Sequence, residues 1–171
     1  TIIDERTSTN ERISTKNTFD YILGNPPFIG YAWQNEMQKN DMTTIFSTIK
    51  GAGVLDYVTA WYVKAAQLIQ NTKTKVAFVS TNSISQGEQP GILWSLLFNH
   101  YKIKIHFAHR TFKWSNEAKS NAAVHVVIIG FANFDSNNKV IYEYENPKGE
   151  PHKVKCKNIN QYLIDAKDVI I

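Results

Sequence analysis

The amino-acid sequence predicts an α/β fold in which parallel strands are followed by an antiparallel strand pair. Short apolar runs rich in strand-forming residues alternate with segments of helical period over the first hundred residues. Further strand-like runs then follow one another without a helical segment between them. The chain has 171 residues, of which 43% are hydrophobic, and this length suits one domain with a single sizeable core.

The first predicted strand covers residues 19–24 (FDYILG). Residues 1–18 before it are polar and rich in Thr and Asn, and they are interpreted as a loop or a cut end. The strand stops at Pro26 and Pro27, because proline lacks the N–H that a central strand needs. Residues 31–53 are polar with scattered aromatics, which predicts a long loop.

Two helices and one strand are predicted next. Apolar residues recur at helical spacing over 54–70. Residues 75–81 (KVAFVST) read as a fully buried strand, and residues 88–99 repeat the helical pattern, with Pro90 tolerated in the first turn. This alternation of strands and helices favours parallel pairing with right-handed crossovers.

The second half is predicted to contain strands alone. Two of them are residues 102–109, which alternate in polarity, and residues 122–131, which are strongly apolar. Residues 140–145 and 152–157, separated by a turn that holds two prolines, predict a hairpin.

Composition excludes several classes of protein. With 20% charged and 12% aromatic residues, the chain is not a disordered tail. No apolar run approaches the roughly 18 residues of a membrane span, so no membrane partner is expected. A single cysteine, Cys156, excludes a disulfide framework, which favours the reducing cytoplasm. His106, His109 and His125 lack metal-ligand spacing, so no metal site is predicted.

The residues with the clearest chemical meaning are Asn25, Pro26, Pro27 and Phe28. They directly follow a predicted strand of a parallel sheet, where ligands of such folds bind. Asn25 offers a side-chain carbonyl oxygen. Pro26 offers a backbone carbonyl held in a fixed direction, with no N–H on Pro27 to compete for it. Two convergent acceptors on a stiff loop are suited to holding both hydrogens of an amino group.

An exocyclic amine is a poor nucleophile, because its lone pair is delocalised into the ring. Acceptors placed for a tetrahedral nitrogen stabilise the reacting geometry more than the planar ground state. Phe28 adds an aromatic face for an extruded base. The pattern favours methyl transfer to an amino group. The alternative is a rigid turn with Phe28 packed in the core.

The segment FDYILGNPPF resembles the catalytic motif of adenine-specific (N6) DNA methyltransferases that use S-adenosylmethionine. Residues 76–89 and 111–131 resemble two further segments of the large bacterial enzymes that fuse modification with restriction. The resemblance covers roughly residues 19–131 and, less closely, 158–163. It implies the C-terminal part of a class I methyltransferase (Rossmann-like) sheet, with double-stranded DNA as the partner and a flipped adenine as the acceptor.

The resemblance also implies roles for individual residues. In the family, the motif's Asn and its first Pro carbonyl hold the target amine, which corresponds to Asn25 and Pro26 here. The motif's aromatic residue, Phe28, stacks on the flipped base. A second aromatic before the last strand supports the base, and this corresponds to Phe112, with Trp114 as a competing candidate.

Part of the cofactor site implied by the resemblance is missing from the sequence. Too few residues precede 19–24 for the strands and the Gly-rich turn that bind the cofactor. The GxG at 51–53 follows no apolar strand and lacks the expected acidic partner, so the dinucleotide fingerprint fails. We expect this chain alone to bind S-adenosylmethionine very weakly, to have no turnover and to need the remaining parts of a longer parent chain. The expected organisation is a loop or cut end (1–18), the catalytic part of a methyltransferase domain (19–132), and a hairpin and connector towards a target-recognition domain (133–171).

Positive charge is concentrated between residues 100 and 121. This stretch has five basic residues and one acidic residue, a net +4 that equals the charge of the whole chain. One interpretation is a rim that contacts DNA phosphates beside Phe112 and Trp114. The other is a solvated edge strand protected by lysines. The basic residues concerned are Lys102, Lys104, Arg110, Lys113 and Lys119.

Two other functions remain open at this stage. A methyltransferase with a similar loop can act on another amine, such as a protein glutamine or an RNA guanine, and a methylation assay across substrates separates these. The chain can also be a non-catalytic nucleic-acid-binding module that keeps the motif as scaffold. A module of this kind should bind DNA in a salt-dependent manner, and the substitution Asn25→Ala should leave that binding unchanged.

Overall fold

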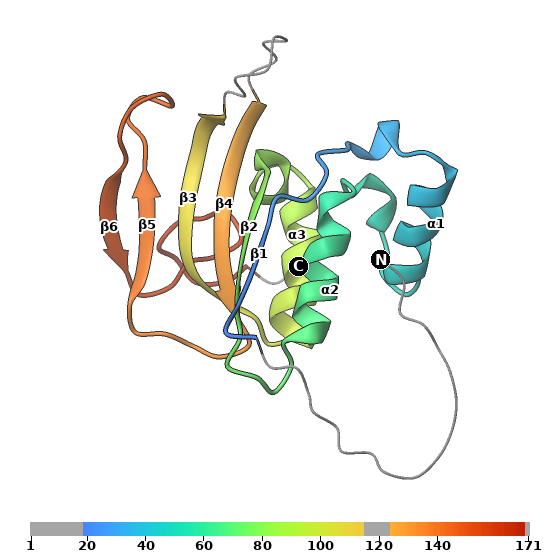
Figure 1. Cartoon of the computed structure of the whole chain (residues 1–171), viewed down its shortest axis with the longest axis horizontal. Coiled ribbons are helices and arrows are strands. Elements are labelled where there is room, and N and C mark those ends of the chain that lie inside the picture. The colour runs from blue at the N-terminus through green and yellow to red at the C-terminus, as the bar shows by residue number, and fades with distance from the viewer. Residues whose placement is uncertain (1–18, 115–123, 170–171) are drawn as a thin grey trace.

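The computed structural model of the chain describes residues 19–114 and 124–169, which form a mixed α/β structure around one sheet (Figure 1). The strands are β1 (Tyr21–Gly24), β2 (Lys75–Thr81), β3 (Lys104–Trp114), β4 (Val124–Ala132), β5 (Lys139–Glu143) and β6 (His152–Cys156). The helices are α1 (Glu36–Ile45), α2 (Val58–Leu68) and α3 (Gln89–Ser95), with short 3-10 turns η1 (Tyr31–Trp33), η2 (Ala52–Val54) and η3 (Asn82–Ser85) and a π-helical turn η4 (Leu96–His100). None of the helices in these described ranges has the length and apolar character needed to cross a membrane.

The sheet has the strand order β1-β2-β4-β3-β5-β6. β1 pairs with β2 in parallel, as the alternation of strands and helices predicts. β4 is inserted between β2 and β3 and is antiparallel to both. β5 is parallel to β3, and β6 closes the sheet as the antiparallel partner of β5. The predicted fold class and the predicted hairpin are therefore both confirmed.

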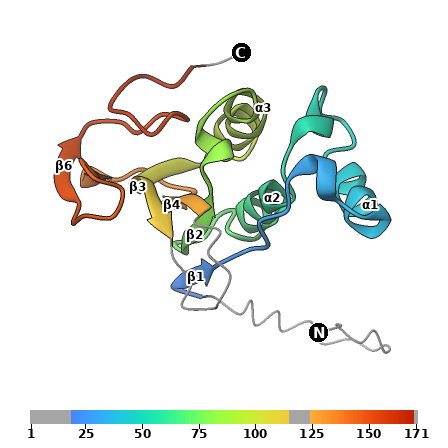
Figure 2. The same cartoon turned by 90° about the horizontal axis from the view of Figure 1, so that it is seen from above.

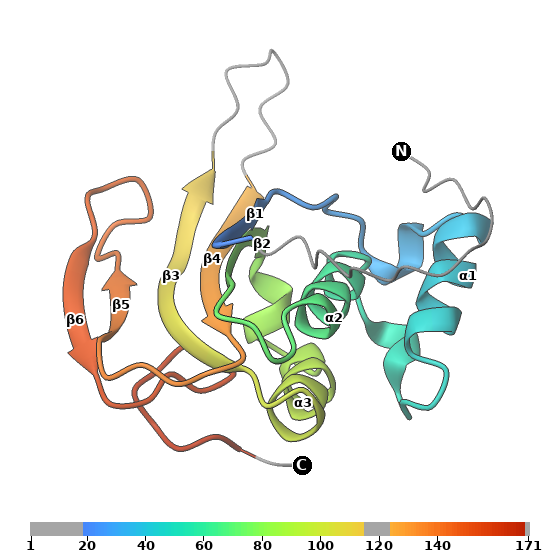
Figure 3. The same ribbon diagram turned by 60° about the horizontal axis from the view of Figure 1, so that its bottom comes forward.

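These pairings give β1, β2, β3 and β5 the same direction, so their carboxyl ends lie at one edge of the sheet, which we call the carboxyl edge. Seen from above, α2 and α3 lie on the same face of the sheet (Figure 2). Figures 1 and 3 agree in placing β5 and β6 at one side of the molecule and α1 at the opposite side.

The core is built around four aromatic side chains between the sheet and the helices. Tyr62 of α2 stacks on Phe131 with ring centroids 5.4 Å apart, and it meets Phe78 and Trp94 edge to face at 5.3 and 5.7 Å. The Tyr62 hydroxyl is 2.8 Å from Ser80 Oγ, so its polar end is satisfied within the core. The apolar residues that predicted these elements thus meet in one cluster.

The predicted long loop over residues 31–53 was wrong in part, because it contains helix α1. Only Met42 of this helix is buried, so the segment shows no apolar period that would indicate a helix. Its start is stabilised by a capping box in which Asn35 Oδ1 accepts from Gln38 N at 2.9 Å and Gln38 Oε1 accepts from Asn35 N at 3.0 Å. That pair is the local sequence signal for the helix, and a search for apolar period does not detect it.

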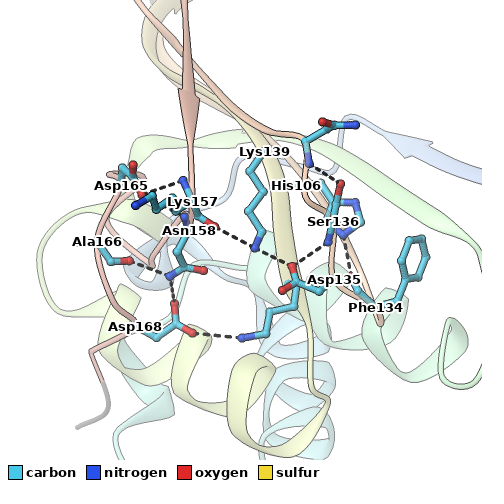
Figure 4. A network of polar contacts seen from close by, with 12 residues as sticks. His106, Phe134, Asp135, Ser136, Lys139, Lys157, Asn158, Asp165, Ala166 and Asp168 are labelled. Carbon is cyan, nitrogen blue, oxygen red and sulfur yellow. Dashed lines mark hydrogen bonds and ion pairs between the residues drawn. The ribbon is translucent and has the colours of Figure 1, made fainter.

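The chain after β6 is attached to the sheet by a polar network (Figure 4). Lys139 is only 4% exposed, and its ammonium lies 2.6 Å from Asp135 Oδ1 and donates to the Lys157 carbonyl at 3.3 Å. Asn158 Nδ2 donates to Asp168 Oδ1 at 2.8 Å, and Lys104 lies 3.5 Å from the other oxygen of Asp168. The connector at 158–163 therefore packs on the sheet, with Ile159 and Leu163 buried.

We expect the free energy of unfolding to fall as the pH drops below about 6.5, the ordinary histidine value. Burial lowers the pKa of both His106 and His109. The unfolded state then binds more protons than the folded state, so acid favours unfolding. Chemical denaturation of the chain at pH 7.5 and 5.5 measures the effect. In His109→Asn the difference between the two pH values should shrink, and a larger or unchanged difference contradicts the assignment.

Candidate functional site

The Asn-Pro-Pro-Phe motif leaves β1 at the carboxyl edge, as the sequence predicts. Gly24 is the last residue of the strand and pairs with Phe78 of β2. A Cβ atom at Gly24 would lie 2.9 Å from Phe78 Cε1, so only glycine fits this end of the strand without displacing the ring. We call residues 25–31 the motif loop. The close approach of Phe78 therefore favours glycine at the residue directly before the motif loop.

The two predicted acceptors of the motif loop are available. Asn25 is exposed, Pro26 is buried and Phe28 is half-buried. The Pro27 carbonyl accepts from Ile29 N at 3.1 Å, which makes a tight turn directly after the motif. Within residues 19–114 and 124–169, no hydrogen bond occupies the Asn25 side chain or the Pro26 carbonyl, which leaves both oxygens free for a ligand.

The motif loop is held from behind by the residues that precede α2. Tyr57 N donates to the Ile29 carbonyl at 2.9 Å, and Tyr31 N donates to Asp56 Oδ1 at 3.0 Å. A carboxylate at Asp56, two residues before the first residue of α2, suits the dipole of that helix. In the structure its carboxylate instead contacts the motif loop, across 25 residues of chain. In the sequence, the one sign of this contact is a carboxylate that lies next to the apolar Leu55 and just before a buried helix.

Phe112 lies near the end of β3, at the same carboxyl edge as the motif loop. Three strand spacings separate β1 from β3, about 14 Å in all. The Phe112 ring stacks on Tyr144 with centroids 5.1 Å apart and lies 6.2 Å from the Trp114 ring. Both predicted aromatics therefore belong to one cluster at this edge, with Tyr144 as a member that sequence reasoning missed.

The structure divides the five predicted DNA-contacting residues into separate groups. Lys102 and Lys104 stand at the start of β3, and Lys113 stands at its carboxyl end about 30 Å away along the strand. Arg110 forms an ion pair with Glu143 at 3.1 Å, while Lys104 pairs with Asp168. Lys119 lies outside the described residues. Lys113 is thus the described member closest to the carboxyl edge.

A cleft of about 400 Å³ opens at the carboxyl edge between η3 and the ends of β3 and β5. The Arg110–Glu143 pair lies in its wall, together with Tyr144 of the aromatic cluster. Tyr31, the last residue of the motif loop, and Trp33, two residues after it, are both exposed, Trp33 to 86%. Because Trp33 is so exposed, packing against the described residues does not account for an aromatic side chain at this position.

Neither the GxG at 51–53 nor the buried Asp56 fits the part of an S-adenosylmethionine site that binds the cofactor. Gly51 adopts φ +81° and caps η2, but this turn comes after α1 and follows no strand. It therefore lacks the context of a Gly-rich cofactor turn, as the sequence predicted. The buried Asp56 is not free to bind a ribose, because Tyr31 N occupies Oδ1 and Ser83 Oγ occupies Oδ2. These two features therefore supply neither the Gly-rich turn nor the ribose-binding carboxylate of such a site.

Comparison with known proteins gives three matches. The family described as "MmeI, DNA-methyltransferase domain" matches residues 3–143. The chain is 45% identical over 152 residues to DNA methyltransferase A of Bacillus subtilis (strain 168), covering 88% of this chain and 16% of that protein. It is 58% identical to the Type IIL restriction-modification enzyme MmeI solved in complex with DNA, with a TM-score of 0.84, covering 88% of this chain and 20% of that one. The chain thus spans a fifth or less of the length of these relatives.

Proposed function

This chain belongs to the MmeI DNA-methyltransferase domain family, and from this premise we propose that it transfers a methyl group to the exocyclic amine of a flipped adenine in double-stranded DNA. The methyl donor of the proposal is S-adenosylmethionine. We further propose that the chain is one segment of a longer restriction–modification enzyme, called the full-length enzyme below, because it spans only 16% and 20% of its relatives.

The observation that carries the proposal is the pair of unoccupied acceptors on the motif loop. Asn25 is exposed at the end of β1. The second acceptor is the main-chain carbonyl of the buried Pro26, and the proline ring fixes the backbone direction there. The loop is anchored behind this pair through Ile29 and Tyr31. A rigid loop with two free acceptors can hold an amino group by both of its hydrogens.

The proposed chemistry uses these two acceptors to favour the reacting geometry of the amine. Hydrogen bonds to Asn25 Oδ1 and the Pro26 carbonyl draw the nitrogen towards a tetrahedral form, which localises its lone pair. The cofactor supplies an electrophilic methyl group. The amine nitrogen would form its bond to this methyl group as the methyl–sulfur bond breaks, and the demethylated cofactor would leave as a neutral thioether. The nitrogen would become cationic and then lose a proton to water, so no strong base is needed on the protein. Phe28 and the Phe112–Trp114 cluster are proposed to stack on the extruded base.

The proposed DNA contacts are made by the basic residues that lie at the carboxyl edge. Lys113 is the described basic residue best placed for a phosphate there. Arg110 would first have to exchange its pairing with Glu143 for a phosphate. Contacts by Lys102 and Lys104 would need the duplex to reach the opposite end of β3. We therefore propose that Lys113 contributes to DNA affinity and to its salt dependence.

The test is methyl transfer by the full-length enzyme from tritiated S-adenosylmethionine to duplex DNA, RNA and protein in parallel. We expect label in duplex DNA, recovered as N6-methyladenine after digestion to nucleosides. Label recovered only in RNA, in protein or in methylated cytosine would overturn the adenine proposal. Salt-dependent DNA binding with no label in any substrate would instead indicate a non-catalytic module.

A further inference from the structure

We propose that Asp56 is a positioning residue for methyl transfer, whose carboxylate holds the motif loop against the loop that follows β2. This inference rests on the proposed function, since it concerns the placement of Asn25. Asp56 touches neither the acceptor base nor the methyl donor in this proposal. It acts through the backbone that carries the motif.

The two oxygens of the Asp56 carboxylate bind two different loops. Oδ1 accepts from Tyr31 N at 3.0 Å, and Oδ2 accepts from Ser83 Oγ at 2.6 Å. Tyr31 belongs to the motif loop after β1, and Ser83 belongs to η3 directly after β2. β1 and β2 are adjacent parallel strands, so one buried charge joins the two loops that leave them at the carboxyl edge. Hydrogen bonds to an ionised group are stronger than those between neutral groups.

The neighbours of Asp56 reinforce the same attachment. The Leu55 carbonyl accepts from Gln34 Nε2 at 3.0 Å in a buried contact. Tyr57 N donates to the Ile29 carbonyl at 2.9 Å. Residues 55–57 therefore contact the chain between 29 and 34 at three successive positions. Asp56 is the only one of the three that also reaches the loop after β2.

The carboxylate matters for the reaction because acceptor geometry is sensitive to small shifts. Asp56 is only 9% exposed, so water does not readily replace it as the acceptor for Tyr31 N and Ser83 Oγ. Without it, the motif loop keeps its fixed prolines but loses its tie to η3. A misplacement of about 1 Å at a reacting group costs about 100-fold in rate.

The test compares three variants of the full-length enzyme by steady-state methylation of duplex DNA. Asp56→Ala should lower kcat about 10- to 100-fold while KM for DNA changes less than about threefold. Asp56→Asn should recover most of kcat, because its amide oxygen can accept from Tyr31 N and its amide nitrogen can donate to Ser83 Oγ. Asp41→Ala is the matched control. It removes a carboxylate that accepts from the Tyr57 hydroxyl at 2.7 Å but does not contact the motif loop, and its kcat should stay near the wild-type value.

Hydrogen exchange gives a readout that does not depend on activity. In Asp56→Ala, the amide of Tyr31 and its neighbours in the motif loop should exchange faster than in Asp41→Ala. A kcat of Asp56→Ala within twofold of wild type, or equal losses in Asp56→Asn and Asp56→Ala, overturns the positioning role. If the wild-type enzyme methylates no substrate, the proposed function fails. Hydrogen exchange then tests only the attachment of the motif loop by Asp56. Faster exchange of the Tyr31 amide in Asp56→Ala supports this attachment, and unchanged exchange contradicts it.

Discussion

Asn25→Ala in the full-length enzyme is expected to lower the rate of methyl transfer by at least about 100-fold, the loss typical of removing one preorganised polar group that acts in the transition state. The substitution deletes the side-chain oxygen and leaves the Pro26 carbonyl as the single acceptor. One acceptor can still bind the amine, but it cannot hold both hydrogens in a tetrahedral arrangement. The measurement is single-turnover transfer from tritiated S-adenosylmethionine to duplex DNA.

DNA affinity should stay unchanged in the same variant. Asn25 is uncharged and exposed, and it forms no hydrogen bond with the described residues, so we expect its removal to alter neither the fold nor the charge that attracts phosphates. Asn40→Ala is the matched control, because Asn40 is an exposed asparagine on α1, and it should retain wild-type rates. Retention of more than half of the wild-type rate by Asn25→Ala contradicts the acceptor role. An equal loss of DNA affinity would mean that Asn25 contributes to DNA binding rather than to the transfer step.

The parts of the fold that could be predicted are those that bury continuous apolar surface. β1 and β2 follow from runs of strand-forming residues that end at Pro26 and at the Ser/Asn-rich turn η3. α2 follows from an apolar period of which Val58, Tyr62 and Ala65 are buried in the structure, while Trp61 and Leu68 are exposed. By contrast, α1 has a single buried residue, and its helical state depends on a local capping box that a search for apolar period does not see.

The end of β3 shows why strand limits were harder to predict. The sequence predicts residues 102–109, whereas the strand continues to Trp114. Register shifts occur before Phe107 and again between His109 and Phe112, so the alternation of polarity breaks where the strand continues. The pairing that extends β3 is with residues 124–126 of β4, 10 to 14 residues further along the chain, so the alternation within 102–109 alone does not encode it.

The residues of the candidate site also differ in how far the sequence could predict them. Asn25 and Pro26 could be proposed as acceptors because four consecutive residues suggest both the geometry and the chemistry. Asp56 could not be proposed as their support, since its two partners are 25 and 27 residues away in the chain. Lys102 and Lys113 belong to one basic stretch of the sequence, yet they lie far apart in the structure. Neighbours in sequence are spread along an extended strand by about 3.3 Å per residue.

The largest loss of stability is expected for Trp94→Ala, about 3–5 kcal/mol in the free energy of unfolding of the chain. Trp94 of α3 is 0% exposed and packs against Tyr62 at 5.7 Å and Phe98 at 5.3 Å between ring centroids. Its removal leaves a cavity in the aromatic core, and the rigid rings around it cannot close the space. Chemical denaturation measures the change. The exposed Trp33→Ala serves as control, with an expected change within about 0.5 kcal/mol.

Trp94 also connects the core to the carboxyl edge. Its Nε1 donates to the Ile84 carbonyl at 2.8 Å, and Ile84 lies in η3 beside Ser83, the partner of Asp56. Trp94→Phe keeps most of the packing but leaves this buried carbonyl unpaired, at a cost of about 1–3 kcal/mol. If packing and the hydrogen bond both contribute, the phenylalanine variant should fall between wild type and Trp94→Ala. A Trp94→Phe variant as stable as wild type would show that the hydrogen bond to η3 adds nothing, and that the position of η3 depends on its other contacts.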